Sequence, residues 1–235
     1  MSRRPGPLPS HARIVPPHVP FTPAEQRLVR RLNTPSAVQA WLNGLAYNAE
    51  DHGETLRSFR SVVAAGSAHC LEAALAAATV LEQHGFPPLL LSFESIDLLD
   101  HVIFVYRGRR GWGSIARSRD PGLHGRRAVF ATPRALALSY FDPYVDGEGC
   151  IKAYTVVSLG VLGAYDWRLS TRNVWAVERM LLDLPHRPIR YSTDRLARLR
   201  AEYAARRAQL GAKPWRHYRG RERWSPLPAE FRHRG

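Results

Sequence analysis

The sequence contains very little lysine and cysteine, and it has no long apolar run. Lysine occurs only at positions 152 and 213, so arginine supplies nearly all of the 34 basic side chains, which exceed the 20 acidic ones by 14 charges. The longest mostly apolar stretch, residues 155–165, is far shorter than a membrane span. With 45% hydrophobic residues in 235, the composition excludes global disorder, and we expect one domain with appendages.

Cys70 and Cys150 are too few to form a disulfide framework. No apolar segment follows the arginines at positions 3 and 4, so the sequence predicts no secretory signal, free thiols and a cytoplasmic location. The common zinc, dinucleotide and P-loop motifs (CxxC, HExxH, GxGxxG, GxxxxGKS/T) are absent as well. We therefore expect no metal, no cofactor and no membrane partner.

The positive charge is concentrated near the carboxyl end. Residues 185–235 hold 14 Arg and Lys against 4 Asp and Glu, whereas the preceding residues hold 20 against 16. We divide the chain into a proline-rich arm (1–21), a domain with amino-terminal helices (22–184) and a basic, partly helical extension (185–235).

The basic extension interleaves arginine with Trp215, Tyr218 and Trp224. Arginine and aromatic side chains together suit phosphate contact and base stacking, so nucleic acid is one candidate partner. The alternative, which we favour, is that the aromatic side chains anchor the extension on its own domain while the arginines stay in water.

Apolar periodicity and capping residues predict an α+β fold, with helices first, then a central helix, then hairpin strands. Pro87 and Pro88 follow the end of the central helix, and residues 108–111 form the hairpin turn. We expect helices at 23–32, from 35, at 54–64, 70–81, 132–140, 173–182 and 193–210, and strands at 89–93, 101–106, 112–116 and 152–159. Residues 141–146 are typical of a tight turn.

Cys70 stands at the start of the alanine-rich central helix. A helix amino terminus stabilises a thiolate, which is the nucleophilic form of cysteine, and its free N–H groups can hold an oxyanion. His101 begins a strand 31 residues later and can act as general base and acid if that strand packs near the helix. Asp120, or alternatively Ser118, is a candidate for orienting the imidazole. His69 adjoins the cysteine, but helical geometry turns it about 100° away, so we expect a surface or scaffold role.

These residues have ordinary structural explanations too. A lone cysteine in an alanine-rich helix is usually a small core residue, and ten histidines make chance pairs common. The polar segment 47–55 reads as a capped loop, or alternatively as a wall of a substrate cleft through Glu50 or His52. Asp97, Asp100 and the acidic residues at 142–146 lack calcium-site spacing and read as solvated loop carboxylates.

The order of these features resembles the transglutaminase-like superfamily, a branch of the papain-like cysteine fold. The resemblance is carried by Gly66–Ala73, His101–Tyr106 and Gly111–Ala116, within residues 47–146, and it extends to a bacterial subgroup without a settled substrate through the segments 123–127 and 138–141. It implies a central helix packed on a small antiparallel sheet, Cys70 as nucleophile, His101 as its partner, and a peptide or protein amide substrate.

One position departs from that superfamily. Its acidic residue usually stands four positions after the tryptophan of the second hairpin strand, which here is Ala116, whereas Asp120 stands eight after Trp112. Either the loop is longer and Asp120 turns back, or Ser118 or a backbone group orients His101, or the site is degenerate. Two functions follow: a cysteine-dependent acyl-transfer enzyme (amide hydrolase, deamidase or transglutaminase type), or an inactive scaffold that binds a polyanion through its basic extension.

Overall fold

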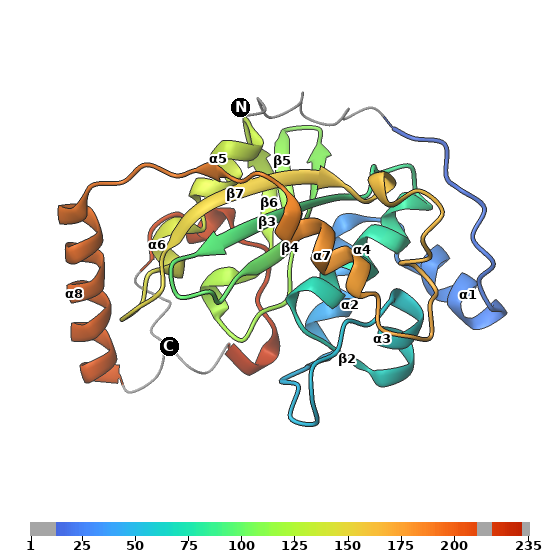
Figure 1. Cartoon of the computed structure of the whole chain (residues 1–235), viewed down its shortest axis with the longest axis horizontal. Helices are drawn as coiled ribbons and strands as arrows, with labels where there is room; N and C mark the ends of the chain where they lie inside the picture. Colours follow the sequence, from blue (N-terminus) through green and yellow to red (C-terminus); the bar gives the residue numbers. More distant parts are fainter. Residues whose placement is uncertain (1–12, 211–217, 232–235) are drawn as a thin grey trace.

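A computed structural model of the chain describes residues 13–210 and 218–231, and these residues form a mixed α+β fold. Six strands form an antiparallel sheet in the spatial order β6-β5-β4-β3-β7-β8 (Figure 1). The strands are β3 (Leu89–Ser95), β4 (His101–Gly108), β5 (Gly111–Ile115), β6 (Arg126–Phe130), β7 (Ile151–Ser158) and β8 (Arg187–Pro188). The predicted α+β class is confirmed.

Strands β4 and β5 form the predicted hairpin, in which Phe104 pairs with Ile115 and Gly108 with Gly111. Gly111 has φ +147°, and a Cβ atom there would lie 2.5 Å from the carbonyl oxygen of Phe130 in β6. Glycine is therefore required where these strands meet. The sequence pattern does not predict β6, because the strand is short and opens with two arginines.

Helix α4 (Cys70–Glu82) is the central helix, and all of its residues after Cys70 are buried. Small alanine side chains allow close packing against its neighbours. Alternate residues of the sheet belong to two different cores: Phe104 packs in the cluster that contains α4, whereas Ile103 and Val105 pack in the other. Because both faces of the sheet are covered, β3 opens with three consecutive leucines and is buried at nearly every position rather than at alternate ones.

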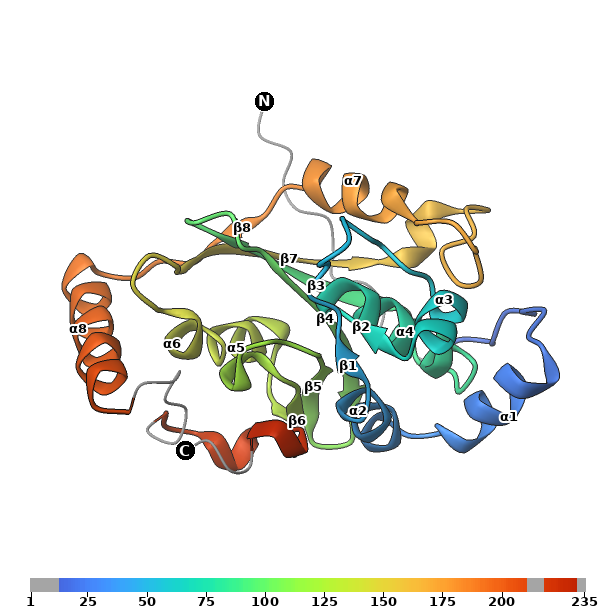
Figure 2. The ribbon, with the colours of Figure 1, turned by 90° about the horizontal axis from the view of Figure 1, so that it is seen from below.

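The remaining helices surround these two cores. They are α1 (Pro23–Arg31), α2 (Pro35–Asn43), α3 (Phe59–Ala65), α5 (Pro133–Leu138), α6 (Phe141–Tyr144), α7 (Trp175–Asp183) and α8 (Thr193–Leu210). Figures 1 and 2 agree that α1 and α8 lie at opposite ends of the molecule. In the described ranges, no helix combines the length and the apolarity needed to cross a membrane.

Two local predictions need correction. Helix α3 begins at Phe59 rather than near 54, because Ser58 caps it and the backbone N–H groups of Leu56 and Arg57 donate to Asn173 and Glu72. Residues 141–144 form the short helix α6 rather than a simple turn, with the Tyr144 N–H donating to the Tyr140 carbonyl. Before α3, side chains distant in sequence (Asn173 and Glu72) hold the backbone out of the helix, whereas α6 is closed by a local backbone hydrogen bond.

The described part of the amino-terminal arm lies along the end of α4. The Ile14 N–H donates to the Gly85 carbonyl at 2.9 Å, and the Arg13 guanidinium lies 3.8 Å from the centre of the Phe86 ring. The Gln83 side chain donates to the Pro17 carbonyl at 3.2 Å. These contacts bring residues 13–17 back onto the central helix.

The described end of the chain, residues 218–231, packs on the domain. Trp224 is buried, forms a bridge with Arg126 at the edge of the sheet and lies beside the Tyr218 ring. Phe231 packs edge-on against His124, with ring centres 5.4 Å apart. These contacts agree with the anchoring interpretation for the aromatic residues, except Trp215, which lies outside the described residues.

Candidate active site

Cys70 is the first residue of α4 and is half-buried. The N–H groups of the first helical turn have no acceptors within the helix, and the helix dipole adds partial positive charge there. Cys150 is by contrast fully buried, and burial raises its pKa. The two thiols are therefore in opposite environments.

His101 begins β4, is 4% exposed, and lies near enough to Cys70 to lower the pKa of its thiol. Its ring stacks parallel to Phe93 of the neighbouring strand, with centres 6.3 Å apart. The His101 Nε2 atom lies 3.0 Å from the carbonyl oxygen of Leu123, so Nε2 carries a proton and donates it. This leaves Nδ1 as the ring nitrogen for the sulfur.

The electrostatics of this pair favour a thiolate. Burial opposes ionisation of Cys70, but hydrogen bonds from His101 and His69, together with their charges, bring its pKa well below the usual range. A low pKa is what distinguishes a reactive cysteine from a structural one. The structure thus brings together the predicted Cys70 and His101.

His69 is a second imidazole at the sulfur, which the sequence prediction did not include. Its ring contacts Cys70, and its Nε2 lies 2.9 Å from the Thr55 carbonyl oxygen. The expected 100° turn away does not apply, because His69 is the N-cap, with extended rather than helical backbone (φ −87°, ψ −176°). The spacing from His69 to Glu72 is that of a capping box, which is the signal that could have placed it.

Two groups compete for Nδ1 of His69. In the neutral ring Nδ1 accepts the Leu71 N–H at 3.2 Å, whereas in the protonated ring Nδ1 can donate to the Cys70 thiolate. Burial disfavours the charged ring, but the hydrogen bond to Cys70, its charge and that of Glu72 raise the His69 pKa to about 9. When Cys70 is a thiolate, the protonated form therefore prevails at neutral pH.

Glu72, in the first turn of α4, holds the start of this helix through hydrogen bonds to neighbouring segments. It is completely buried and accepts hydrogen bonds from Thr55 Oγ1, the Arg57 N–H and the Asn48 side chain, at 2.8–3.0 Å. It also accepts the His69 N–H at 3.0 Å. A buried carboxylate with this many donors forms a rigid support for the residues around Cys70.

The polar segment 47–55 is bound to Glu72 through the side chains of Asn48 and Thr55. Glu50 accepts the Thr55 N–H at 2.7 Å and lies 3.9 Å from His69 Nε2, whereas His52 is exposed. Glu50 has φ +62°, in the left-handed region, and its own N–H donates to the Asn48 side chain. The loop interpretation accounts for most of the segment, while the Glu50 carboxylate and the Thr55 carbonyl oxygen reach the His69 ring.

Asp120 does not take the predicted position. Its carboxylate accepts the Gly122 N–H at 3.0 Å and caps a short 3-10 helix (Pro121–Leu123), while its own N–H donates to Ser118 Oγ. The hydrogen bond that orients His101 comes instead from the backbone at Leu123. Of the alternatives that the sequence leaves open, the backbone group is the one that the structure contains.

Arg126 holds the loop that carries this carbonyl. Its guanidinium donates to the carbonyl oxygens on both sides of Leu123, at 2.6 Å to Gly122 and 2.7 Å to His124. It is fully buried between aromatic rings, 4.0 Å from the centre of Tyr140 and 4.7 Å from that of Trp224. Such stacking stabilises a buried arginine. The loop is therefore fixed from outside the candidate active site.

Two tyrosines lie within electrostatic reach of Cys70. Burial, followed by the Cys70 charge, raises the Tyr47 pKa to about 12, and the same two causes raise that of Tyr144. Both hydroxyls remain protonated donors at neutral pH. Arg119 lies 5.8 Å from the Tyr47 ring centre, and the Tyr144 hydroxyl donates to the carbonyl of the exposed Leu99. Neither tyrosine has a motif that marks it in the sequence.

The acidic loop residues have local partners. Asp97 accepts from the Ser95 hydroxyl, Asp100 accepts the Ser95 N–H at 2.8 Å, and Asp146 accepts the N–H groups of Glu148 and Gly149. Across residues 13–210 and 218–231, no cluster of three His, Cys, Asp or Glu side chains could hold a metal ion.

The site therefore combines a low-pKa thiol, two imidazoles and neutral hydroxyl donors at a helix amino terminus. No family model matches the chain, and no curated protein matches its sequence. The geometry of the site alone carries the functional conclusion.

Proposed function

We propose that this protein is a cysteine-dependent acyl-transfer enzyme with a papain- or transglutaminase-like arrangement. The observation that carries the proposal is the position of the Cys70 thiol at the start of α4, where His101 and His69 both lower its pKa. The helix that bears the cysteine and the strand that bears the histidine follow the order of that superfamily. The third group departs from it, since a carbonyl replaces the acidic side chain.

The chemistry follows from the protonation states. The Cys70 thiolate attacks an amide or ester carbonyl, and the resulting oxyanion accepts the Cys70 N–H, which has no acceptor within the helix. Protonated His101 gives its proton to the leaving amine or alcohol as the C–N or C–O bond breaks, and a thioester remains. Water or an amine then gives its proton to His101 and attacks the thioester, which releases the product and restores the thiolate.

His101 can give and take up its proton at the reacting atoms only if its ring cannot rotate. The Nε2–H bond to Leu123 O sets the orientation and directs Nδ1 at the sulfur. A carbonyl dipole stabilises the imidazolium less than a full carboxylate charge would, and His69 supplies a second positive group beside the thiolate. We therefore expect a thiol activated by two histidines rather than by an acid–histidine pair.

A thiol-directed acyl probe tests the proposal. The wild-type chain and the Cys150→Ala variant should form one covalent adduct on Cys70, faster than a model thiol, and Cys70→Ala should form none. If Cys70 reacts no faster than a model thiol, and Cys150 is labelled equally, the nucleophile assignment is wrong. Peptide amide and ester substrates, with and without an added amine, then separate hydrolysis from amine transfer.

The inactive polyanion-binding scaffold is the competing proposal. Trp224 and Phe231 are already engaged in intramolecular packing, which takes two aromatic side chains away from base stacking. A salt titration of RNA or DNA binding by the full chain distinguishes the two functions. Affinity that falls steeply with salt, together with an unreactive Cys70, would favour the scaffold.

A further inference from the structure

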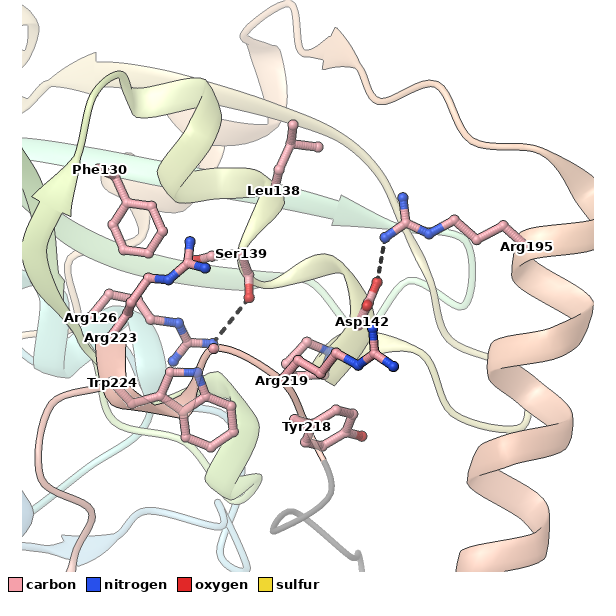
Figure 3. A pocket seen from close by; sticks show the side chains of 12 residues that line it. Arg126, Phe130, Leu138, Ser139, Asp142, Arg195, Tyr218, Arg219, Arg223 and Trp224 are labelled. Carbon is pink, nitrogen blue, oxygen red and sulfur yellow. Dashed lines mark hydrogen bonds and ion pairs between the residues drawn. The ribbon is translucent and has the colours of Figure 1, made fainter.

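Four arginines line a pocket of about 190 Å³ (Figure 3), and Cys70 is not among its lining residues. Residues of β6, α5, α6, α8 and the segment 218–224 line it. The pocket is smaller than the 300–1,000 Å³ typical of drug-sized ligands. It therefore suits a small ligand.

The lining is strongly positive. Arg126, Arg195, Arg219 and Arg223 reach the pocket from two sides, and Asp142 is the one carboxylate among its described lining residues. Arg195 pairs with Asp142 at 2.6 Å, which leaves three arginines without a carboxylate from the lining. Arg219 and Arg223 are exposed, and the acidic partner of Arg223 among the described residues is its neighbour Glu222, outside the pocket, at 3.3 Å.

Arg126 is the buried side chain of this pocket, and its position is fixed by hydrogen bonds. It is fully buried, and no carboxylate of the described residues forms an ion pair with it; Asp120 acts on it only through its longer-range charge. Its terminal nitrogens donate to backbone carbonyls, whereas its Nε has no acceptor among the described residues. An unpaired guanidinium of this kind is costly, and an anion would offset the cost.

We propose that this pocket binds a phosphate-class dianion, either inorganic phosphate or the terminal group of a phosphate monoester. Arginine forks match the oxygens of a tetrahedral anion and form charge-assisted hydrogen bonds with them. Arg219 and Arg223 close on the anion from the solvent side, and Arg126 supplies the fixed positive charge at the base. Cys70 and His101 do not line this pocket, but Arg126 belongs both to the pocket and to the support of the loop that orients His101.

Calorimetric titration of the full chain with inorganic phosphate, at constant ionic strength, tests the site. We expect saturable one-to-one binding, weakened at least about tenfold in an Arg219→Ala, Arg223→Ala double variant. An Arg172→Ala, Arg179→Ala double variant removes the same charge from exposed positions outside the pocket and should stay within about twofold of wild type. All four positions are exposed, so these variants should fold.

Phenyl phosphate serves as a parallel probe to distinguish the two sources of the anion. Tighter binding of the monoester supports an esterified ligand, and tighter binding of inorganic phosphate supports the free ion. The proposal is overturned if neither probe shows saturable binding, or if both double variants lose affinity equally. The second result would mean that net charge alone attracts the anion.

Discussion

His101 Nε2 lies 3.0 Å from the carbonyl oxygen of Leu123, so a backbone atom accepts the hydrogen bond that orients the imidazole. Such an acceptor cannot be removed by a point mutation. It can be displaced only through the residues that hold its loop, which are Arg126 on one side and Asp120, as a cap, on the other.

Replacement of Asp120 tests this arrangement. Asp120→Asn keeps the oxygen that accepts the Gly122 N–H and removes the charge, so we expect acylation of Cys70 within about threefold of wild type. Asp120→Ala removes the cap and should slow acylation further. In sites that depend on an acidic third residue, Asp→Asn costs about 10⁴ in rate. A loss of that order in Asp120→Asn would show that the Asp120 carboxylate, and not the Leu123 carbonyl, orients His101.

The alkylation rate of Cys70 should rise with pH well below the range of a free thiol. The thiolate reacts, so the rate increases as pH rises through the depressed pKa and is then constant. In His101→Ala the midpoint should move up, towards about 8.5, because one hydrogen-bonding and charged partner is lost. Cys150→Ala serves as the control and should leave the profile unchanged. A wild-type midpoint near that of a free cysteine would contradict the site.

Buried His124 should make the fold sensitive to acid. Burial, followed by the charge of Arg117, lowers its pKa to about 3, from the usual 6.5. As pH falls below 6.5 only the unfolded chain takes up this proton, so stability is lost down to about pH 3. Between pH 7.5 and 5.0 the residue should cost about 2 kcal/mol, measured by urea unfolding. His124→Gln should show a pH dependence smaller by that amount, and equal slopes would show that His124 is protonated in the fold.

Trp224→Ala should affect both stability and reactivity. Removing a buried tryptophan typically costs about 3–5 kcal/mol, and here the indole also covers Arg126. Cys70 acylation should therefore slow in the folded variant, since the loop that orients His101 loses part of its support. Leu182→Ala, at a site 68% exposed, should change neither thermal unfolding nor acylation. Unchanged acylation in Trp224→Ala would show that the carboxy-terminal segment does not help to orient His101.

The sequence predicts those features that depend on local patterns. Helix α8 matches its expected range of 193–210, and α4 begins at the expected Cys70, because capping residues and apolar periodicity mark them. The hairpin is confirmed for the same reason. The contact of Cys70 with His101 depends on tertiary packing, yet the order of helix and strand was enough to suggest it.

Other features could not be read in this way. Any residue can supply a backbone carbonyl, so no side-chain pattern marks Leu123 as the partner of His101. Helical spacing misplaces His69, because that residue is a cap whose backbone is not helical. The role of Arg126 depends on Trp224, almost a hundred residues further along the chain.

The packing of residues 224–231 on the loop of Leu123 and His124 joins a late-synthesised segment to an early one. On the ribosome, Cys70 and His101 emerge long before Trp224 and Phe231 have been synthesised. Until then the guanidinium of Arg126 lacks its indole cover, and His124 lacks its aromatic neighbour. A nascent chain thus carries the nucleophile beside a less firmly held base, and its reactivity should increase when synthesis reaches the carboxy-terminal segment.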